Sequence, residues 1–187
     1  MAAPQKPFGF TLIELMITIA VLVILVTLAA PAFNLAEQRR VIGAAESALD
    51  PIQTARSEAI KQGRNIYFVS PEEGNDWCLG ISDRPNCNCM SAETEADACK
   101  IKLSEDGGTD DDGRFLRTTQ STDFRNVRMT EAIQEIEFNH VRGTLADLDA
   151  RRLVFASDNY SMEVQINPIG RTRACGTDRA MGAYSEC

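Results

Sequence analysis

Hydrophobic residues are concentrated near the start of the chain. From Leu15 to Phe33 no side chain is charged, and most are Leu, Ile, Val, Ala or Met. A helix that spans a bilayer needs about 20 predominantly apolar residues. Phe10–Phe33 provides 24 residues, interrupted by one acid, Glu14. This pattern predicts a membrane-spanning helix over residues 10–33.

The pattern becomes amphipathic after Pro31. Apolar residues recur at intervals of seven, as in a helix that packs one face on a globular core. Gly63 is expected to end this helix, and Pro51 to kink or restart it. We therefore predict an amphipathic helix over residues 34–63. The repeating residues are Leu35, Ile42 and Leu49, together with Ala45, Ile52 and Ala59.

The remaining sequence, residues 64–187, is typical of a β domain. Several short segments alternate apolar and polar residues, as half-buried antiparallel strands do. Between residues 83 and 113 this periodicity is absent, and we predict an acidic loop there. The expected strands are Ile66–Ser70, Trp77–Ile81, Phe115–Thr119, Val127–Thr130, Glu135–Phe138, Leu153–Ala156 and Met162–Ile166.

Composition and charge restrict the function classes. With 187 residues, 44% of them hydrophobic, the chain is long enough for one domain plus appendages. Its net charge of −8 provides no overall attraction to nucleic acid or anionic lipid. Residues 72–112 hold twelve acids and three bases, whereas residues 113–187 hold ten acids and ten arginines. A basic surface is therefore expected only locally, in the C-terminal part.

The cysteines all follow the apolar segment. An even number after an export signal predicts disulfides formed in an oxidising compartment. Cys87-x-Cys89 suggests metal as the alternative, but zinc sites usually place about two to four residues between paired cysteines and add histidine. The only histidine is the isolated His140, so we expect disulfides and no metal. The six positions are Cys78, Cys87, Cys89, Cys99, Cys175 and Cys187, and their spacing leaves the pairing open.

Glu14 is the unusual residue of the apolar segment. A carboxylate inside a spanning helix costs roughly 2.5–3.5 kcal/mol on insertion scales, and such a residue is expected to have a functional partner. Residues 10–33 contain no basic side chain. A cut after Gly9 would supply a cation, because the new α-amine of Phe10 would lie one helical turn from Glu14. In a filament, that amine and a neighbour's Glu14 could then pair.

Two other interpretations of this segment stay open on these grounds. Ala30-Pro31-Ala32 resembles the cleavage site of a secretory signal, with Lys6 as a thin positive region. The length of the apolar run and Glu14 near its entrance disfavour that interpretation, since secretory signals carry positive charge there. A plain single-span anchor is the third interpretation.

The residues around the expected cut resemble a known signal. Lys6-Pro-Phe-Gly9-Phe10-Thr-Leu-Ile-Glu14-Leu is similar to the type III signal of type IV prepilins and type II secretion pseudopilins. The resemblance implies that residues 1–9 are a leader, which prepilin peptidase removes between Gly9 and Phe10 before Phe10 is N-methylated. It also implies that Glu14 is the assembly glutamate and that Pro31 kinks the spine helix.

Two further segments are similar to the GspH/FimT family, which contains FimT- and FimU-type minor pilins and the H pseudopilin. They are Gln53–Lys61 and the strand and turn Glu137–Thr144. The resemblance implies an α+β fold, in which a long N-terminal spine helix, transmembrane in its first half, packs on a C-terminal antiparallel β-sheet or sandwich domain. As in many pilins, Cys175 and Cys187 would close the tail, and the other four cysteines would pair among themselves.

The sequence contains no recognisable catalytic motif. The segment 106–113 resembles a calcium loop, but a glycine and a threonine stand where an EF-hand needs oxygen ligands. No G-x-S-x-G, P-loop or H-E-x-x-H motif is present, and His140, Glu135 and Glu137 have ordinary structural interpretations. We expect no enzyme activity, no metal and no cofactor.

Gly170-Arg171-Thr172-Arg173 is the remaining candidate site, and it matches the G-R-x-R motif of the GspH/FimT family. Beyond a glycine turn, an extended chain directs Arg171 and Arg173 to one side, where they can hold successive phosphates. In FimT-type members the motif is associated with DNA binding in natural transformation. The alternative is a structural turn with surface arginines, since relatives not associated with DNA uptake also carry it. Basic residues expected to assist are Arg179, and Arg151 and Arg152 if the fold brings them near.

These features together predict a minor pilin, a structural subunit for type IV pilus assembly or initiation. A DNA-binding minor pilin and the H pseudopilin of type II secretion are the alternatives. The expected partners are other pilins or pseudopilins, prepilin peptidase, the inner-membrane assembly platform and, in one alternative, DNA. We expect a single-pass inner-membrane protein with a periplasmic C-terminal domain, later assembled into a pilus or pseudopilus.

Overall fold

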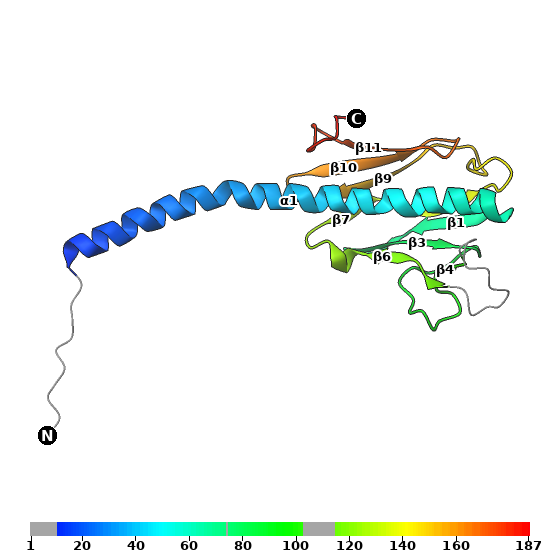
Figure 1. The fold of residues 1–187 in the computed structure, drawn as a ribbon, viewed down its shortest axis with the longest axis horizontal. Coiled ribbons are helices and arrows are strands. Elements are labelled where there is room, and N and C mark those ends of the chain that lie inside the picture. The colour runs from blue at the N-terminus through cyan, green and yellow to red at the C-terminus, as the bar shows by residue number, and fades with distance from the viewer. Residues whose placement is uncertain (1–10, 74, 103–114) are drawn as a thin grey trace, which may run out of the picture. The chain divides into compact units, whose positions relative to one another are not determined.

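The structure is a computed structural model that describes residues 11–73, 75–102 and 115–187. A long helix, α1 (Leu12–Gln62), precedes a series of short strands (Figure 1). The chain divides into two compact units, Met1–Ala36 and Glu37–Cys187, and α1 contributes to both. The helix is continuous through Pro31 and Pro51, so Pro51 does not restart it.

The first unit contains the N-terminal part of α1. Thr11 caps the helix, because its hydroxyl and carbonyl oxygens accept hydrogen bonds from the Glu14 N–H at 3.3 and 3.1 Å. The large apolar side chains from Leu12 to Val26 are 49–77% exposed. Within the three described ranges, no helix combines the length and the apolarity of a bilayer crossing.

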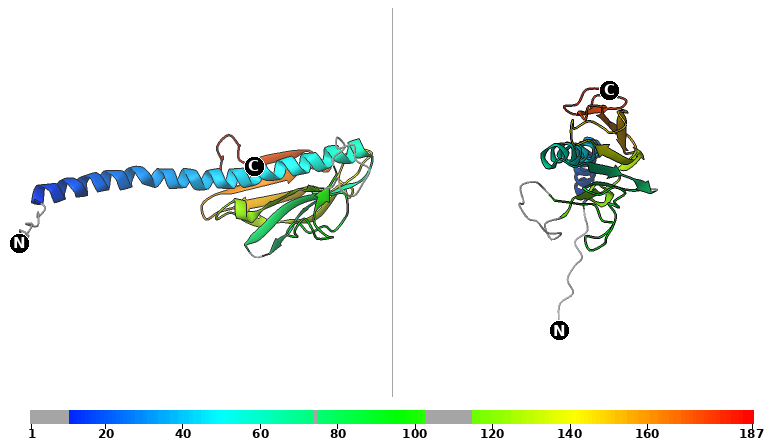
Figure 2. Two further views of the ribbon diagram at one scale, coloured as in Figure 1. Left: turned by 60° about the horizontal axis from the view of Figure 1, so that its bottom comes forward. Right: turned by 90° about the vertical axis from the view of Figure 1, so that its right-hand side faces the viewer.

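The second unit places residues 37–62 of α1 against two antiparallel sheets, with the helix on one side and the strands on the other (Figure 2). The five-stranded sheet has the order β2 (Glu72–Glu73), β3 (Asp76–Ser82), β1 (Ile66–Ser70) and β8 (Ile133–Phe138), and β6 (Thr118–Gln120) also pairs with β3. The four-stranded sheet has the order β11 (Thr172–Gly176), β10 (Ser161–Ile166), β9 (Arg151–Ala156) and β7 (Arg128–Glu131). A separate ribbon pairs β4 (Lys100–Ile101) with β5 (Phe115–Leu116), and a 3-10 helix covers Ser121–Asp123.

One stripe of α1 forms the helical side of the core. Ala45, Ile52 and Ala59 are fully buried, which confirms the predicted seven-residue repeat over this part of the helix. Leu35 does not continue the stripe and is 55% exposed. The stripe consists mostly of alanines, and small side chains let a helix lie close to the strands. The largest fully buried side chains are Trp77, Phe68, Phe138 and Phe155.

Three disulfides close the loops of the β domain. They join Cys78 to Cys89, Cys87 to Cys99 and Cys175 to Cys187, in agreement with the pairing that the family resemblance implies. The first two disulfides pack against Gly80 of β3. A Cβ on Gly80 would lie 2.8 Å from both the Cys89 Cβ and the Cys99 Sγ. Only glycine fits at that position. Cys87 and Cys89 are both engaged in disulfides, so neither offers a free thiolate to a metal ion.

The α+β prediction is confirmed, with local corrections. The predicted loop over residues 83–113 contains β4, and neither β2 nor β11 was among the predicted strands. The predicted strand Phe115–Thr119 is divided between β5 and β6, because its two halves pair with β4 and β3 respectively.

Candidate functional site

The Gly170–Arg173 motif forms the turn between β10 and β11. The Asn167 N–H donates to the Arg171 carbonyl at 3.0 Å, and the Gly170 N–H donates to the Asn167 carbonyl at 2.8 Å. The Asn167 side-chain oxygen also accepts from the Arg171 N–H at 2.8 Å. Gly170 has a φ of +76°, which side chains rarely tolerate. The turn therefore requires glycine, and it fixes the backbone of Arg171 at the start of β11.

Gly170 also contacts the loop between β8 and β9. A Cβ on Gly170 would lie 2.6 Å from the Gly143 carbonyl oxygen and 3.0 Å from the Arg56 side chain. Arg56, on α1, donates from Nε to that same carbonyl at 2.9 Å. The three segments that resemble the GspH/FimT family separately along the sequence thus meet at one point of the fold.

Arg171 and Arg173 are exposed, and the half-buried Thr172 lies between them. The Thr172 hydroxyl accepts from Gln53 Nε2 of α1 at 3.2 Å, so Thr172 is directed toward the helix. Arg173 is therefore on the opposite, outer face of the sheet, where its Nη2 donates to Ser185 Oγ at 3.3 Å. In the part of the chain that the structure describes, neither arginine forms an ion pair with a carboxylate.

Arg152 shares the outer face with Arg173 but is neutralised. Both residues pair with Gln165 across β10, which places their Cα atoms about 10 Å apart. Arg152 forms two bonds to the Glu131 carboxylate, of which the Nη2–Oε1 bond is 2.7 Å long. Arg151 is likewise paired with two aspartates of the β8–β9 loop. Neither residue offers a free cation to a phosphate.

Arg179 lies away from the motif. Its Nη2 donates to the Asn159 carbonyl at 2.9 Å, and its guanidinium carbon lies 5.2 Å from the centre of the Tyr160 ring. Asn159 and Tyr160 precede β10, whereas Arg171 follows it across the turn. Arg179 therefore lies at the opposite end of the β10–β11 hairpin, and the structure does not bring it together with Arg171 and Arg173.

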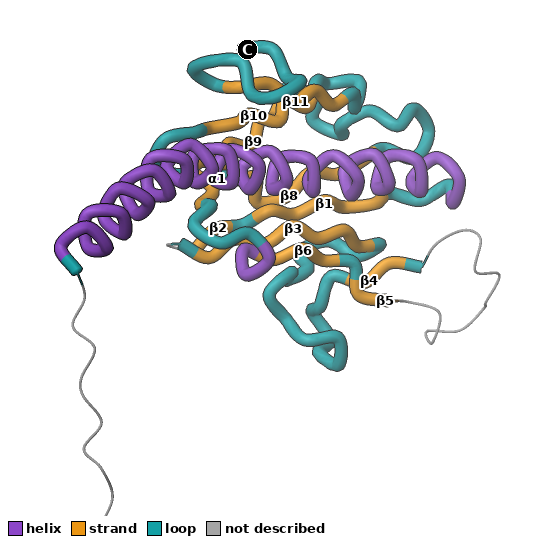
Figure 3. The backbone as a smooth tube through the Cα atoms, turned by 60° about the vertical axis from the view of Figure 1, so that its left-hand side comes forward, coloured by secondary structure: helices purple, strands orange, loops and turns teal. Residues whose placement is uncertain are grey.

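The C-terminal loop packs against α1. Figure 3 shows this loop beyond β11, ending at the C-terminus. The Tyr184 hydroxyl donates to Glu46 Oε1 at 2.7 Å, and Gln38 Nε2 lies 3.8 Å from Met181 Sδ. The hydrogen bond to Glu46, burial and the charge of that carboxylate raise the pKa of Tyr184 above its ordinary value.

Glu37 ties the β9–β10 turn to the same helix. Its carboxylate accepts from the Asn159 backbone and side-chain nitrogens at 3.2 and 3.1 Å. Hydrogen bonds from the Ser157 and Asn159 side chains lower the pKa of Glu37.

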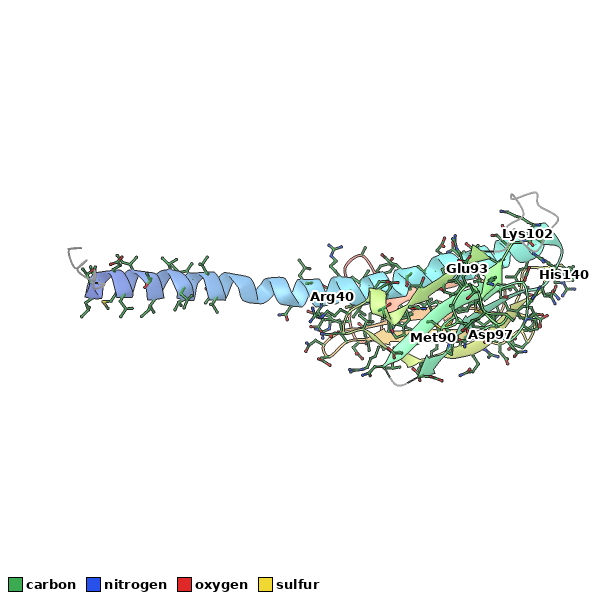
Figure 4. All side chains as sticks on the ribbon, turned by 90° about the horizontal axis from the view of Figure 1, so that it is seen from below. Arg40, Met90, Glu93, Asp97, Lys102 and His140 are labelled. Carbon is green, nitrogen blue, oxygen red and sulfur yellow. A yellow bond between two sulfur atoms is a disulfide. The ribbon has the colours of Figure 1, made fainter. Side chains whose placement is uncertain are left out.

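His140, Glu135 and Glu137 form hydrogen bonds that connect neighbouring segments of the β domain. His140, labelled in Figure 4, has Nδ1 2.7 Å from Asn65 Oδ1, and Asn65 Nδ2 is bonded to the Glu137 carboxylate. Glu135 Oε2 accepts from the Asn86 N–H at 2.6 Å. These contacts join the connection between α1 and β1, and the disulfide-closed loop, to β8 and the residues that follow it.

The predicted processing residues are only partly described. Glu14 is exposed in the first turn of α1, where a carboxylate complements the positive end of the helix dipole. Gly9, Phe10 and the acidic segment 106–113 lie outside the described residues, as does the side chain of Pro31.

Sequence reasoning missed two arginines near the motif. Arg56 touches both Gly143 and the position of a Gly170 Cβ, and Arg142 immediately precedes Gly143 in the sequence. Arg56 belongs to the Gln53–Lys61 segment and was assigned only to the helix. Arg142 lies within Glu137–Thr144, but the resemblance of that segment rests on Glu137–Asn139 and Gly143–Thr144, so the sequence offered no signal for Arg142 itself.

Two family profiles match the chain. The first, described as type II transport protein GspH, matches residues 44–170, and the second, described as the prokaryotic N-terminal methylation motif, matches residues 5–30. No curated protein sequence matches significantly. Two crystal structures of the type IV minor pilin FimU from Pseudomonas aeruginosa are similar in structure, with sequence identities of 20% and 18% and TM-scores of 0.45 and 0.48. The alignments cover 73% and 76% of this chain and 96% of each FimU chain.

An N-terminal methylation motif, followed by a long helix on antiparallel sheets, defines a subunit of the type IV pilin class. Within that class the chain belongs to the GspH family, whose profile covers more than half of its residues.

Proposed function

We propose that this chain is a minor pilin, a structural subunit that takes part in the assembly or initiation of a type IV pilus. The observation that carries the proposal is Glu14, the single charged residue between Leu12 and Val26 on a helix whose large apolar side chains are 49–77% exposed. Such a surface is unfavourable in water and requires a bilayer or a filament core.

Glu14 would then supply the specific contact of assembly. Cleavage between Gly9 and Phe10 creates an α-amine, and in the filament this amine pairs with Glu14 of a neighbouring subunit. An ion pair in apolar surroundings is far stronger than one in water, so it sets the axial register of adjacent helices. Transfer from lipid to filament core exchanges one apolar environment for another, and the helix is never exposed to water.

The chain works through binding and not through catalysis in this proposal. Its partners are other pilins, the prepilin peptidase and the inner-membrane assembly platform. It is anchored in the inner membrane by a single pass, with its C-terminal domain in the periplasm. The three disulfides support this location, because such bonds form in oxidising compartments.

Processing and assembly are tested separately in the native host. Mass spectrometry of the mature chain is expected to find an N-methylated Phe10 at its start. Glu14→Val is expected to be processed normally but to be absent from sheared filaments. Glu37→Gln, which removes another α1 carboxylate, is the matched control and should be incorporated. An uncut N-terminus, or a start at Phe33, would exclude the proposal.

DNA binding is a second candidate function, favoured by Arg171 and Arg173, which are exposed and have no carboxylate partner among the described residues. Within the same part of the chain, the neighbouring Arg151 and Arg152 are paired with carboxylates. Fluorescence anisotropy of the full chain in detergent with labelled duplex DNA tests this function. Binding should weaken with salt and should be lost in the Arg171→Gln/Arg173→Gln variant.

The family description raises a third role, as the H pseudopilin of type II secretion. A deletion strain distinguishes it from the pilus role. Loss of exoprotein secretion with intact twitching motility would assign the chain to secretion, and the reverse result would assign it to the pilus.

A further inference from the structure

Exposed arginines without an ion pair among the described residues are found beyond the G-R-x-R motif as well. The β8–β9 loop carries Arg142, which is exposed and immediately precedes Gly143. The Gly143 carbonyl oxygen touches the position of a Gly170 Cβ at 2.6 Å, and Arg171 immediately follows Gly170. Arg142 and Arg171 thus flank the contact between two neighbouring loops, although 29 positions separate them in the sequence.

The two loops are held in fixed relation. Arg56 Nε donates to the Gly143 carbonyl at 2.9 Å, and the Leu145 N–H donates to the Pro168 carbonyl at 3.0 Å. Within the β8–β9 loop, the Gly143 N–H donates to the Asn139 carbonyl at 2.8 Å. The backbone that carries Arg142 is therefore attached to the backbone that carries Arg171, and ligand binding does not have to order it first.

Arg142 resembles Arg171 and Arg173 in having no carboxylate partner among the described residues. Within residues 11–73, 75–102 and 115–187 it forms no ion pair. The nearby aspartates of its own loop, Asp147 and Asp149, are both engaged by Arg151. Although the chain has a net charge of −8, guanidinium groups that form no ion pair with any described residue lie on these two adjacent turns.

We propose that Arg142 is a third phosphate-binding residue, which joins Arg171 and Arg173 in one DNA-binding surface formed by two turns. The proposal rests on the DNA-binding function proposed above and names the part of the fold that carries it. A DNA backbone presents a continuous line of like charges, whereas a protein partner would have to concentrate several carboxylates at one place. Arg56 is a positioning residue in this arrangement, because it joins the two turns from the helix.

The test compares variants that change the net charge equally. Affinity of the full chain in detergent for a labelled duplex is measured by anisotropy from about 50 to about 200 mM salt. Arg142→Gln is expected to weaken binding about tenfold at the lower salt and to reduce the slope of log affinity against log salt by about one. Arg142→Lys should restore the slope, since it keeps the charge. Arg179→Gln and Arg152→Gln are the matched controls and should leave the affinity within about twofold, because their guanidinium groups are already engaged.

The outcomes distinguish failure of the inference about Arg142 from failure of the DNA-binding function itself. If Arg142→Gln behaves as Arg179→Gln does, Arg142 is not a contact and the inference is wrong, while binding by the motif stands. If the unaltered chain does not bind DNA at low salt, both the DNA-binding function and the inference fail, and the minor pilin role is unaffected. If Arg142→Gln leaves DNA affinity unchanged but removes the chain from sheared filaments, the surface is a subunit contact and the inference is likewise overturned.

Discussion

The two ends of the β10–β11 hairpin carry the same kind of residue in opposite circumstances. At the turn, Arg171 and Arg173 extend from a glycine-dependent hairpin and form no ion pair among the described residues. At the other end, Arg179 is engaged by the Asn159 carbonyl and lies over the Tyr160 ring. The comparison shows that arginines close together in the sequence can have different partners in the fold, and the proposed DNA binding uses those that are not engaged by a ring or a carbonyl.

The ends also differ in what fixes them. The C-terminal end is held by a covalent bond, Cys175–Cys187, and by the contact of Tyr184 with α1. The turn is held by hydrogen bonds, of which those from Asn167 and Arg56 are examples, and by the close approach of Gly143 to Gly170. Substitutions at the two ends should therefore change stability by different mechanisms, and only those at the turn should change DNA affinity.

The largest effect is expected when the disulfide at the C-terminal end is removed. Cys175→Ala/Cys187→Ala should lower the free energy of unfolding by about 3 kcal/mol, because a cross-link over a short loop restricts the unfolded chain. Urea unfolding in detergent can be followed by fluorescence, since Trp77 is the only tryptophan and is fully buried. DNA affinity should stay within about twofold of the original. A large loss of affinity would show that the two ends are coupled.

Gly170→Ala should lower the free energy of unfolding by about 2–3 kcal/mol and also weaken DNA binding. The added Cβ meets the Gly143 carbonyl oxygen at 2.6 Å, and the φ of +76° is strained for alanine. Gly63→Ala is the matched control, since Gly63 has a φ of +63° but no atom within 4 Å of the Cβ position. Its expected cost is about 1 kcal/mol. Equal costs at both positions would mean that the contact with Gly143 contributes nothing.

Tyr184→Phe should cost about 1 kcal/mol near neutral pH, through loss of the hydrogen bond to Glu46. Because the folded pKa of Tyr184 lies above the unfolded value, the stability that this residue contributes is complete below about pH 10 and is lost as the pH rises through the folded pKa. The original chain should therefore lose more stability than the variant as the pH rises above about 10, whereas the two should change in parallel below that pH. Parallel pH profiles in urea titrations above that pH would exclude this linkage. Tyr67, whose pKa burial also raises, is present in both chains and cancels.

Arg179→Gln is expected to have the smallest effect, about 0.5 kcal/mol in the same urea titration, because the contact with Tyr160 is solvent-exposed. A cost above about 1 kcal/mol would show that Arg179 is a structural residue of the tail.

The sequence predicted those elements in which the spacing of apolar residues matches the face that is buried in the fold. Ile66–Ser70 matches β1 residue for residue, and the Ala45–Ile52–Ala59 repeat lies in the core, because one buried face determines the spacing of apolar residues. The pattern failed where pairing depends on distant partners. β4 has two residues and exists only through its pairing with β5, and β11 consists of small and charged residues without alternation of hydrophobicity.

The candidate site was predictable in part for the same reason. Arg171 and Arg173 belong to a motif, and the residue spacing of a strand determines their relative direction. Arg179 is close to them in sequence but distant in the fold, since β11 runs away from the turn before the chain reaches Arg179. Arg142 is distant in sequence but close in the fold, and only the contact of Gly143 with Gly170 reveals it.

Every buried residue of the main hydrophobic core lies between Val41 and Met181, within the second unit. The main core therefore contains no residue of the apolar segment Leu12–Val26. In the proposed pilin role, the disulfides of the second unit can therefore form while the apolar segment is still in the membrane, and extraction then changes the surroundings of that segment alone. In that role, a subunit whose disulfides have not formed could be rejected before it enters a filament.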